Sequence, residues 1–303
     1  MLFRILFLIA VASVFPQCLQ SPGQGSKPPT KVIPPADWEL VWSDEFDSTA
    51  LDTSKWNYQL ARGCELGICG WGNKELQYYT DGTGNAALDG AGNLAIVVRR
   101  PDPALRGRFG GRQFTSARLI TKDRVAFAYG LVQARVRLPS GRGIWPAFWM
   151  LGQDLDRVGW PRCGEIDVME NFGKDPSLVH GTVHGPGYAG PDGITASFDA
   201  GMPLADDFHL YSVAWEPARI RWYLDDRLYH TLTPDDLGGS PWVFDHDFFL
   251  LVNVAVGGAF SQPPDSSTSL PQTMLIDYIR VYGRPVSGRL PRPDGVDAGE
   301  RPR

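Results

Sequence analysis

The stretch Gly164–Asn171, with the sequence GEIDVMEN, is the part of the chain around which a fold can be built. Side chains along a β-strand alternate between two faces, so Glu165 and Asp167 share one face, and Ile166 and Val168 pack on the other. Strict alternation would place Glu170 on the buried side, where an unpaired carboxylate is costly. A one-residue β-bulge at Met169 would return Glu170 to the face of Glu165.

This arrangement predicts the chemistry of a pair of catalytic carboxylates. With the bulge, the Cα atoms of Glu165 and Glu170 lie about four strand steps apart, roughly 13 Å. Two side chains leaning together can close most of that gap, towards the ~5–5.5 Å of a retaining glycosidase pair. Asp167 would raise the proton affinity of a neighbour by like-charge repulsion, or hold it by a hydrogen bond. The alternative is that these acids form only the solvated face of a strand.

Strand patterns elsewhere in the chain predict an all-β fold. Leu131–Leu138 alternates apolar and polar residues, as a strand with one buried and one wet face does. Phe248–Val256 is almost continuously apolar and predicts a central strand, broken only by Asn253. No comparable stretch has a sustained helical period, so an antiparallel β-sandwich is expected.

Further motifs occur in a fixed order around the acidic strand. They are WSDEFD at Trp42–Asp47, GWGNKELQYYT at Gly70–Thr80, IWPAFWML at Ile144–Leu151, Trp160-Pro161, and IDYIRVY at Ile276–Tyr282. In this order they resemble the laminarinase-like branch of glycoside hydrolase family 16, over about Trp38 to Tyr282. The resemblance implies a jelly-roll β-sandwich of two antiparallel sheets with a concave substrate cleft.

The resemblance also implies roles for the acids. Glu165 would be the nucleophile, Asp167 its electrostatic assistant and Glu170 the general acid/base. The extra Met169 is the pattern of the branch that cleaves β-1,3 linkages, whereas the similar lichenases lack it. The implied activity is a retaining endo-glycosidase acting on internal β-1,3 bonds of a neutral, laminarin-like glucan by double displacement, with no cofactor for catalysis.

Other functions remain open from the sequence. Within the same family they are hydrolysis of mixed-linkage glucan, agar or carrageenan, and transglycosylation. Outside catalysis, the chain could be a β-glucan-binding module on the same sandwich. Such modules lack the two catalytic glutamates, so the presence of Glu165 and Glu170 favours an enzyme.

Candidate sugar-binding residues lie in a glycine-rich loop and beside the acidic strand. Gly63–Thr80 is long for a loop inside a compact domain, and such loops are usually functional. Trp145 and Trp149 share one parity, and Trp160 can add a third ring for stacking on sugar, although each can equally be a core residue. The full set of candidates is Asn73, Glu75, Arg118, Trp145, Trp149, Trp160, His184 and Asn253. For Asn73 and Glu75 the alternative is loop anchoring, and for His184 a structural role.

A structural calcium is a further expectation from the resemblance. Asp277 lies among apolar neighbours, where it would give one carboxylate ligand, completed by backbone oxygens near Glu45 and Gly92. Hard oxygen ligands suit Ca²⁺, but a single carboxylate gives weak affinity.

Length and charge limit the partners. A chain of 303 residues with 43% hydrophobic residues can form one large sandwich. Its net charge of -5 gives no general attraction for nucleic acid or anionic membranes. The total charge does not favour sulfated glycans either, although a local basic patch could override it. We expect a monomer.

The ends of the chain predict export. Residues 1–18 have a short apolar run after an early arginine, as a signal peptide does. A lipoprotein signal with lipid attachment at Cys18 is the alternative, and contact with a membrane is expected only in that case. The expected product is secreted, periplasmic or anchored at the cell surface. Residues 19–36 are expected to form a flexible linker, residues 37–283 the catalytic domain and residues 284–303 a disordered tail.

Cysteine spacing predicts one small disulfide. Cys64 and Cys69 lie close together in a glycine-containing loop, and an exported protein permits a bridge between them. Two free thiols are the alternative. Cys163 then remains without a partner once Cys18 is set aside.

Overall fold

The computed structural model describes residue 34 and residues 37–284, all within the unit formed by residues 31–303. The predicted signal peptide, Cys18, almost all of the linker and the tail beyond Arg284 lie outside the described residues. Among the described residues, no helix has the length and apolar character that a membrane span requires.

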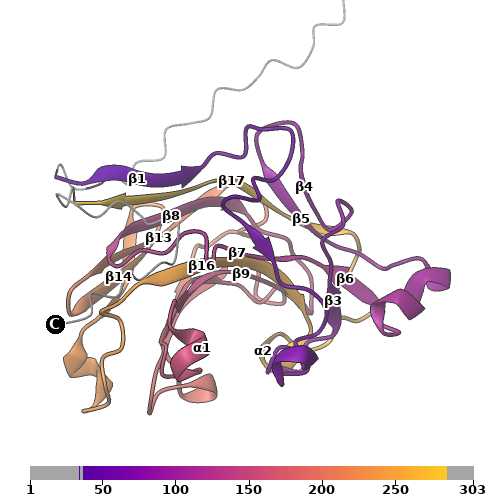
Figure 1. The fold of residues 1–303 in the computed structure, drawn as a ribbon. Coiled ribbons are helices and arrows are strands. Elements are labelled where there is room, and N and C mark those ends of the chain that lie inside the picture. The colour runs from indigo at the N-terminus through magenta and orange to yellow at the C-terminus, as the bar shows by residue number, and fades with distance from the viewer. Residues whose placement is uncertain (1–33, 35–36, 285–303) are drawn as a thin grey trace, which may run out of the picture. The chain divides into compact units, whose positions relative to one another are not determined.

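Two antiparallel sheets are layered on one another (Figure 1). In spatial order, the first sheet contains β15 (Arg227–Leu232), β14 (Arg219–Leu224), β13 (His209–Glu216), β8 (Gly130–Arg137), β17 (Gln272–Gly283), β5 (Leu94–Val98) and β4 (Ala86–Leu88), and β1 (Glu39–Asp44) also pairs with β17. The second contains β12 (Ile194–Asp199), β11 (Leu178–His184), β10 (Glu165–Glu170), β9 (Ile144–Gly152), β16 (Phe248–Val256), β7 (Arg118–Ile120) and β2 (Asn57–Tyr58). The expected all-β sandwich is confirmed.

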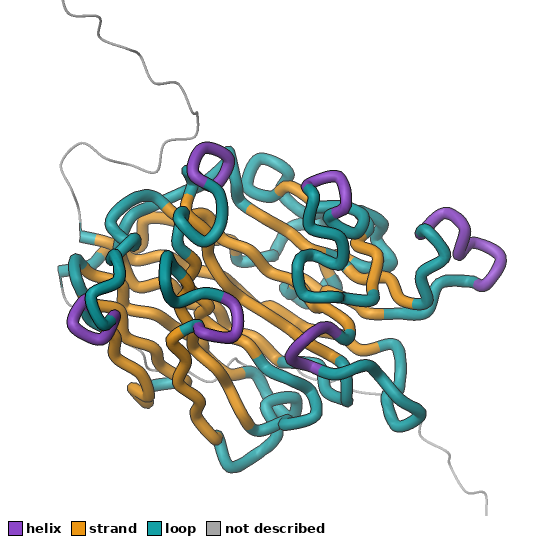
Figure 2. Tube along the Cα trace, turned by 90° about the horizontal axis from the view of Figure 1, so that it is seen from below, coloured by secondary structure: helices purple, strands orange, loops and turns teal. Residues whose placement is uncertain are grey.

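The remaining elements are short and lie in the connections, as Figure 2 shows for the helical turns. A small parallel pair joins β3 (Gln77–Tyr79) to β6 (Phe114–Ser116). The helical turns are η1 (Cys64–Leu66), η2 (Pro103–Phe109), α1 (Leu155–Val158), η3 (Gly190–Asp192), η4 (Pro234–Leu237) and α2 (Gly258–Ser261).

Alternation along the strands determines which face builds the core. In β8, Val132, Ala134 and Val136 pack between the sheets. In β16, Val252 and Val254 join the same core, whereas Asn253 lies on the opposite face of the sheet. Because β16 is buried on both faces, its sequence is almost continuously apolar. On that opposite face, Phe249 and Leu251 of β16 belong to a second, smaller apolar cluster beside Asn253.

Two features of the fold differ from the expected strand pattern. Phe114–Ile120 is not one continuous strand: it divides into β6 and β7, because the chain leaves the parallel pair and joins β16 in the second sheet. The edge strand β12 was not predicted, although its residues alternate regularly between partly buried and exposed.

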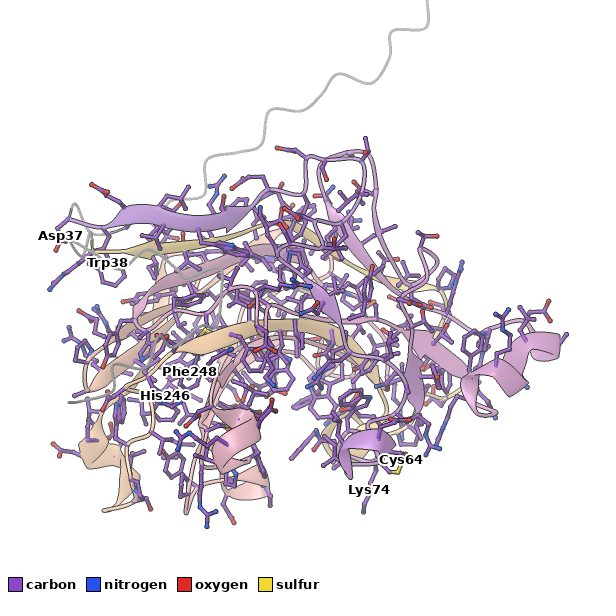
Figure 3. All side chains as sticks on the ribbon, viewed as in Figure 1. Asp37, Trp38, Cys64, Lys74, His246 and Phe248 are labelled. Carbon is purple, nitrogen blue, oxygen red and sulfur yellow. A yellow bond between two sulfur atoms is a disulfide. The ribbon has the colours of Figure 1, made fainter. Side chains whose placement is uncertain are left out.

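The predicted disulfide between Cys64 and Cys69 is confirmed. It closes a turn of the glycine-rich loop around η1, and Figure 3 labels Cys64 and Lys74 of this loop. Cys163 is free and buried, and burial raises the pKa of its thiol to about 12, so it behaves as a core residue.

Candidate active site

A β-bulge in β10 places the acidic residues on one face. Asp167 pairs with Trp149 of β9, but the next paired residues are Met169 and Phe148, so one residue of β10 is extra. On the other side, Asp167 pairs with Thr182 and Glu170 with His180, which gives the same count. The sequence predicts the bulge at Met169; the shift lies between Asp167 and Met169 in the pairing with β9, and between Asp167 and Glu170 in the pairing with β11. Val168 and Met169 both turn into the core, with no exposed surface.

The bulge is supported from the opposite sheet. The indole Nε1 of Trp222, in β14, donates a hydrogen bond of 2.8 Å to the backbone carbonyl of Asp167. Trp222 has no exposed surface and its ring stacks on His230. Gly181 leaves the space for this ring, because a Cβ there would lie 2.5 Å from Trp222 Cδ1. A buried carbonyl displaced by a bulge needs such a donor.

Each glutamate of the pair accepts a hydrogen bond from its own tryptophan. Trp160 Nε1 donates to Glu165 Oε2 at 2.7 Å, and Trp145 Nε1 donates to Glu170 Oε1 at 2.9 Å. Both carboxylates are only partly buried, whereas Asp167 is 3% exposed. The two indoles therefore fix the orientation of the outer acids.

The acids interact strongly enough to alter their protonation. Burial raises the pKa of Glu170 to about 7, with a further increase from the charge of Glu165, although the Trp145 hydrogen bond and His184 oppose the shift. Burial and the charges of Glu165 and Glu170 raise the pKa of Asp167 well above its usual range. A carboxyl group that titrates near neutral pH can both donate and accept a proton.

His184 supplies the compensating positive charge. Its Nε2 lies 3.4 Å from Asp167 Oδ2 and 3.8 Å from Glu165 Oε1. Burial alone would lower the pKa of His184, but the contact with Asp167 and the charges of the three carboxylates raise it to about 9. Gly193 makes room for the ring, because a Cβ there would lie 2.3 Å from His184 Cε1.

Arg118 lies between two aromatic rings beside these acids. Its guanidinium carbon is 4.5 Å from the centre of the Trp71 ring and 4.7 Å from that of Trp149. Burial lowers the pKa of Arg118, while Tyr79, Glu75 and Glu165 raise it. A cation between two indole faces is held without a direct carboxylate partner.

A chain of hydrogen bonds joins the glycine-rich loop to the central strands. Trp149 Nε1 donates to Asn253 Oδ1 at 2.8 Å, Asn253 Nδ2 donates to the Tyr79 hydroxyl at 3.2 Å, and that hydroxyl donates to Glu75 Oε2 at 3.3 Å. Burial raises the pKa of Glu75, and the charge of Arg118 opposes the shift. These buried groups contact one another, so they form the floor of the site.

The three tryptophans expected to stack on sugar lie in different surroundings. Trp160 is 47% exposed, and its ring is open to solvent beside Glu165. Trp145 differs from the expectation: it is only 6% exposed, because Phe172 and Phe260 pack edge-on against its ring. Trp149 has one face covered by Arg118.

The remaining candidates are Asn73, expected to bind sugar, and the residues expected to bind calcium. The backbone carbonyl of Asn73 accepts a hydrogen bond from Ala259 N–H in α2, which ties the glycine-rich loop to the segment beside Trp145. The candidate calcium residues lie away from the acids: Asp277 Oδ2 is 2.8 Å from Arg135 Nη1, and the carboxylate of Glu45 is hydrogen-bonded twice by Arg280.

Two contributors to the site were not predicted from the sequence. Trp222 and Trp71 act through contacts between segments far apart in the chain, which the spacing of a single motif does not reveal. The motif containing Trp71 and Tyr79 was noted, but Trp222 lies in an ordinary alternating strand and carries no sequence signal of its own.

Comparison with known proteins agrees with this geometry. The profile of the glycosyl hydrolases of family 16 matches residues 70–278. A beta-glucanase of Rhodothermus marinus is 44% identical over 255 residues, which cover 81% of this chain and 85% of that protein.

Solved structures give the same result. The laminarinase catalytic domain of Thermotoga maritima is 47% identical, with a TM-score of 0.75, covering 81% of this chain and 98% of that one. An endo-beta-1,3-glucanase of Pyrococcus furiosus is 43% identical, with a TM-score of 0.76, covering 81% and 94%. These similarities extend over most of the described sandwich.

The support from Trp222 can be tested by stability. Trp222→Phe leaves the buried Asp167 carbonyl without its donor, and we expect the free energy of unfolding to fall by about 1–3 kcal/mol from that loss alone. Urea denaturation measures it. Trp242→Phe is the control, because Trp242 Nε1 donates to Asp245 in an exposed position. Equal changes in the two variants would show that the bulge does not depend on this bond.

Proposed function

The chain belongs to the glycosyl hydrolases of family 16, and we propose on this basis that it hydrolyses internal β-1,3-glucosidic bonds of laminarin-like glucans with retention of configuration. The observation that carries the proposal is the single bulged strand that turns Glu165, Asp167 and Glu170 to one face, in a chain 43–47% identical to laminarinase and endo-β-1,3-glucanase structures. The chemistry uses protein side chains and water, without a catalytic cofactor.

In the first step, Glu165 is the nucleophile. A carboxylate oxygen of Glu165 attacks the anomeric carbon, the glycosidic C–O bond breaks, and its electron pair goes to the leaving oxygen. Glu170 donates its proton to that oxygen. The pKa of about 7 keeps a large share of Glu170 protonated near neutral pH, as a general acid requires.

In the second step, Glu170 acts as a base. It takes a proton from water, the water oxygen attacks the anomeric carbon, and the bond to Glu165 breaks. Two inversions restore the starting configuration. Glu165 loses its negative charge in the ester while Glu170 gains one by giving up its proton, so the net charge of the site is unchanged. His184 stays beside Asp167 and Glu165.

Among the candidate sugar-binding residues, the exposed Trp160 would contact sugar directly, and the buried residues would support the surface beneath it. Trp160 presents an open ring beside the nucleophile, which suits stacking on the apolar face of a glucose unit. Glu75, Arg118 and Asn253 are buried at 5–7% exposure, so we assign them to holding the floor and Trp149 in place. Trp145 acts through its hydrogen bond to Glu170.

We also propose a weak structural calcium held by oxygen atoms of Glu45, Gly92 and Asp277. The donors fit a hard cation, and the carboxylate of Asp47 lies beside Gly92, where a Cβ would come within 2.9 Å of its Oδ1. The ion pair of Asp277 with Arg135 already neutralises the buried carboxylate, so low affinity is expected.

Export and a monomeric state complete the proposal. The apolar run near the N-terminus and the disulfide of Cys64 and Cys69 support an exported protein. Mass measurement of the mature N-terminus tests cleavage and any lipid on Cys18, and light scattering after gel filtration tests the monomer. An intact Met1 in the product of an exporting host would contradict the export proposal.

The roles of the glutamates are tested with two variants. Glu165→Gln should lower turnover of laminarin by more than about 10³-fold, because the attacking oxygen is lost. Glu170→Ala should lower it by about 10²–10⁴-fold, but retain more activity on an aryl glycoside with a good leaving group, which needs less protonation. Reducing-end release measures both, on laminarin, lichenan, agarose and xyloglucan.

Glu39→Gln serves as the control for these variants, because it removes one carboxylate from the exposed start of β1 and should leave turnover unchanged. Wild-type turnover in Glu165→Gln would overturn the nucleophile assignment. Wild-type binding without hydrolysis would favour the binding-module alternative.

The pH profile tests the proton donor. Glu170 must carry a proton to act as the general acid, and kcat/KM reports the protonation state of the free enzyme. We therefore expect kcat/KM to fall as the pH rises through about 7. The Trp145 hydrogen bond favours the ionised carboxylate, so Trp145→Phe should raise the pKa of Glu170 and move this limb to higher pH. Trp149→Phe, which loses a bond to Asn253 instead, is the control. A limb that moves to lower pH would contradict the assignment.

Calcium binding is tested by thermal unfolding. The melting temperature should rise by a few degrees in millimolar CaCl₂ relative to EDTA, because a ligand that binds only the folded state stabilises it. MgCl₂ at the same concentration controls for ionic strength. The same melting temperature in all three solutions would remove calcium from the proposal.

A further inference from the structure

A strongly basic segment lies apart from the acidic strand. Residues 99–112 contain five arginines and one aspartate, in a chain whose net charge is -5. Among the described residues, none of these five arginines forms an ion pair, although ion pairs occur throughout the rest of the sandwich. The segment follows β5 and extends beyond β3 and β6 in Figure 1. Its charge is therefore available to an external anion.

The segment has a defined structure. Asp102 caps η2 by accepting a hydrogen bond of 2.8 Å from Ala104 N–H, and Pro103 occupies the first turn. Phe109, at the end of η2, packs edge-on against Tyr78 of β3, with 5.7 Å between ring centres. These contacts hold the arginine-bearing turn against the β3–β6 pair.

Between this segment and β3 there is a cavity of about 690 Å³. Arg99, Arg100 and Arg108 line it, together with Asp81 and Asp102. The guanidinium group of Arg99 packs against Gly84, where a Cβ would lie 2.5 Å from Arg99 Nη1. Three arginines face two aspartates in the lining, so the balance of charge in the cavity is positive.

The rest of the lining is apolar or aromatic. Leu60 and Leu105 also line the cavity and remain 45% and 43% exposed, and Tyr78 and Phe109 contribute partly exposed rings. Guanidinium groups beside aromatic and aliphatic surfaces match a ligand that carries an anionic group on a ring with an apolar face. The volume lies within the range of sites that hold ligands of several rings.

We propose that this cavity binds an acidic glycan, that is, a sugar chain with carboxylate or sulfate groups. The sugar rings pack on Tyr78, Phe109 and the two leucines, and the anionic groups pair with Arg99, Arg100 and Arg108. None of the residues that line the cavity belongs to β10, so the glycan is bound as an anchor and not as a substrate. Arg100 also lines a second hollow with Arg112, which gives a longer chain a continuous basic path.

The test compares binding of matched glycans to the whole protein. Calorimetric titration at low ionic strength uses oligoguluronate as the carboxylate probe, dextran sulfate oligosaccharide as the sulfate probe, neutral dextran oligosaccharide of equal length, and inorganic sulfate. We expect binding of at least one of the two acidic oligosaccharides, with weaker binding of neutral dextran and of inorganic sulfate. Which acidic probe binds more tightly distinguishes carboxylate from sulfate.

Two double variants place the binding in the cavity. Arg99→Gln with Arg108→Gln should weaken binding of the acidic oligosaccharide by about tenfold or more, since two charge-assisted contacts are lost. Arg219→Gln with Arg227→Gln removes the same charge from β14 and β15 and should change it by less than about twofold. Both variants should hydrolyse laminarin like the wild type, because none of these arginines touches the acidic strand.

Four results would overturn the proposal. They are no binding of either acidic oligosaccharide, equal loss of binding in the two double variants, binding of inorganic sulfate as tight as that of the sulfated oligosaccharide, and binding of neutral dextran as tight as that of both acidic chains. Loss of laminarin hydrolysis in Glu165→Gln with glycan binding retained separates this site from the proposed catalytic function.

Discussion

The hydrogen bond from Trp222 Nε1 to the backbone carbonyl of Asp167 connects the two sheets at the point where the acidic strand departs from regular pairing. A bulge is required if Glu165, Asp167 and Glu170 are to share a face, and it turns one carbonyl of the strand towards the core. In an apolar interior that carbonyl would otherwise lack a partner. The site on the outer face therefore depends on a residue of the opposite sheet, and on Gly181, whose missing side chain leaves room for the indole.

Given that bulge, the surroundings of each acid separate their functions. Glu170 has an indole donor and is partly buried, and the burial raises its pKa to about 7, whereas Glu165 lies beside the exposed Trp160 and within 3.8 Å of His184. Asp167 is the most buried of the three and shares its charge with His184. Three carboxylates so close together would repel one another strongly in the ionised state. The positive charge of the histidine and the raised pKa values of Asp167 and Glu170 relieve that repulsion.

The sequence was sufficient for features that depend on local alternation. The outward positions of Glu165 and Asp167, the bulge before Glu170, the buried run of β16 and the disulfide of Cys64 and Cys69 all follow from spacing. The features that could not be predicted from the sequence depend on contacts between segments that are distant in the chain. The burial of Trp145 requires Phe172 and Phe260 to converge on it, and the division between β6 and β7 requires a change of partner strand. Neither has a signal in its own stretch of residues.

The buried polar floor shows why those distant contacts matter for a glycosidase. Burying charged Glu75 and Arg118 is costly, and a buried ionic network is weak support for stability. What it does provide is orientation: Glu75 holds the Tyr79 hydroxyl, Tyr79 holds Asn253, and Asn253 holds the indole N–H of Trp149. Because Arg118 fits between Trp71 and Trp149, moving one member of this set would disturb the others. The glycine-rich loop, β16 and β9 are thereby joined into one rigid surface beneath the acids, so that a polymer bound across it meets the two glutamates in a fixed position.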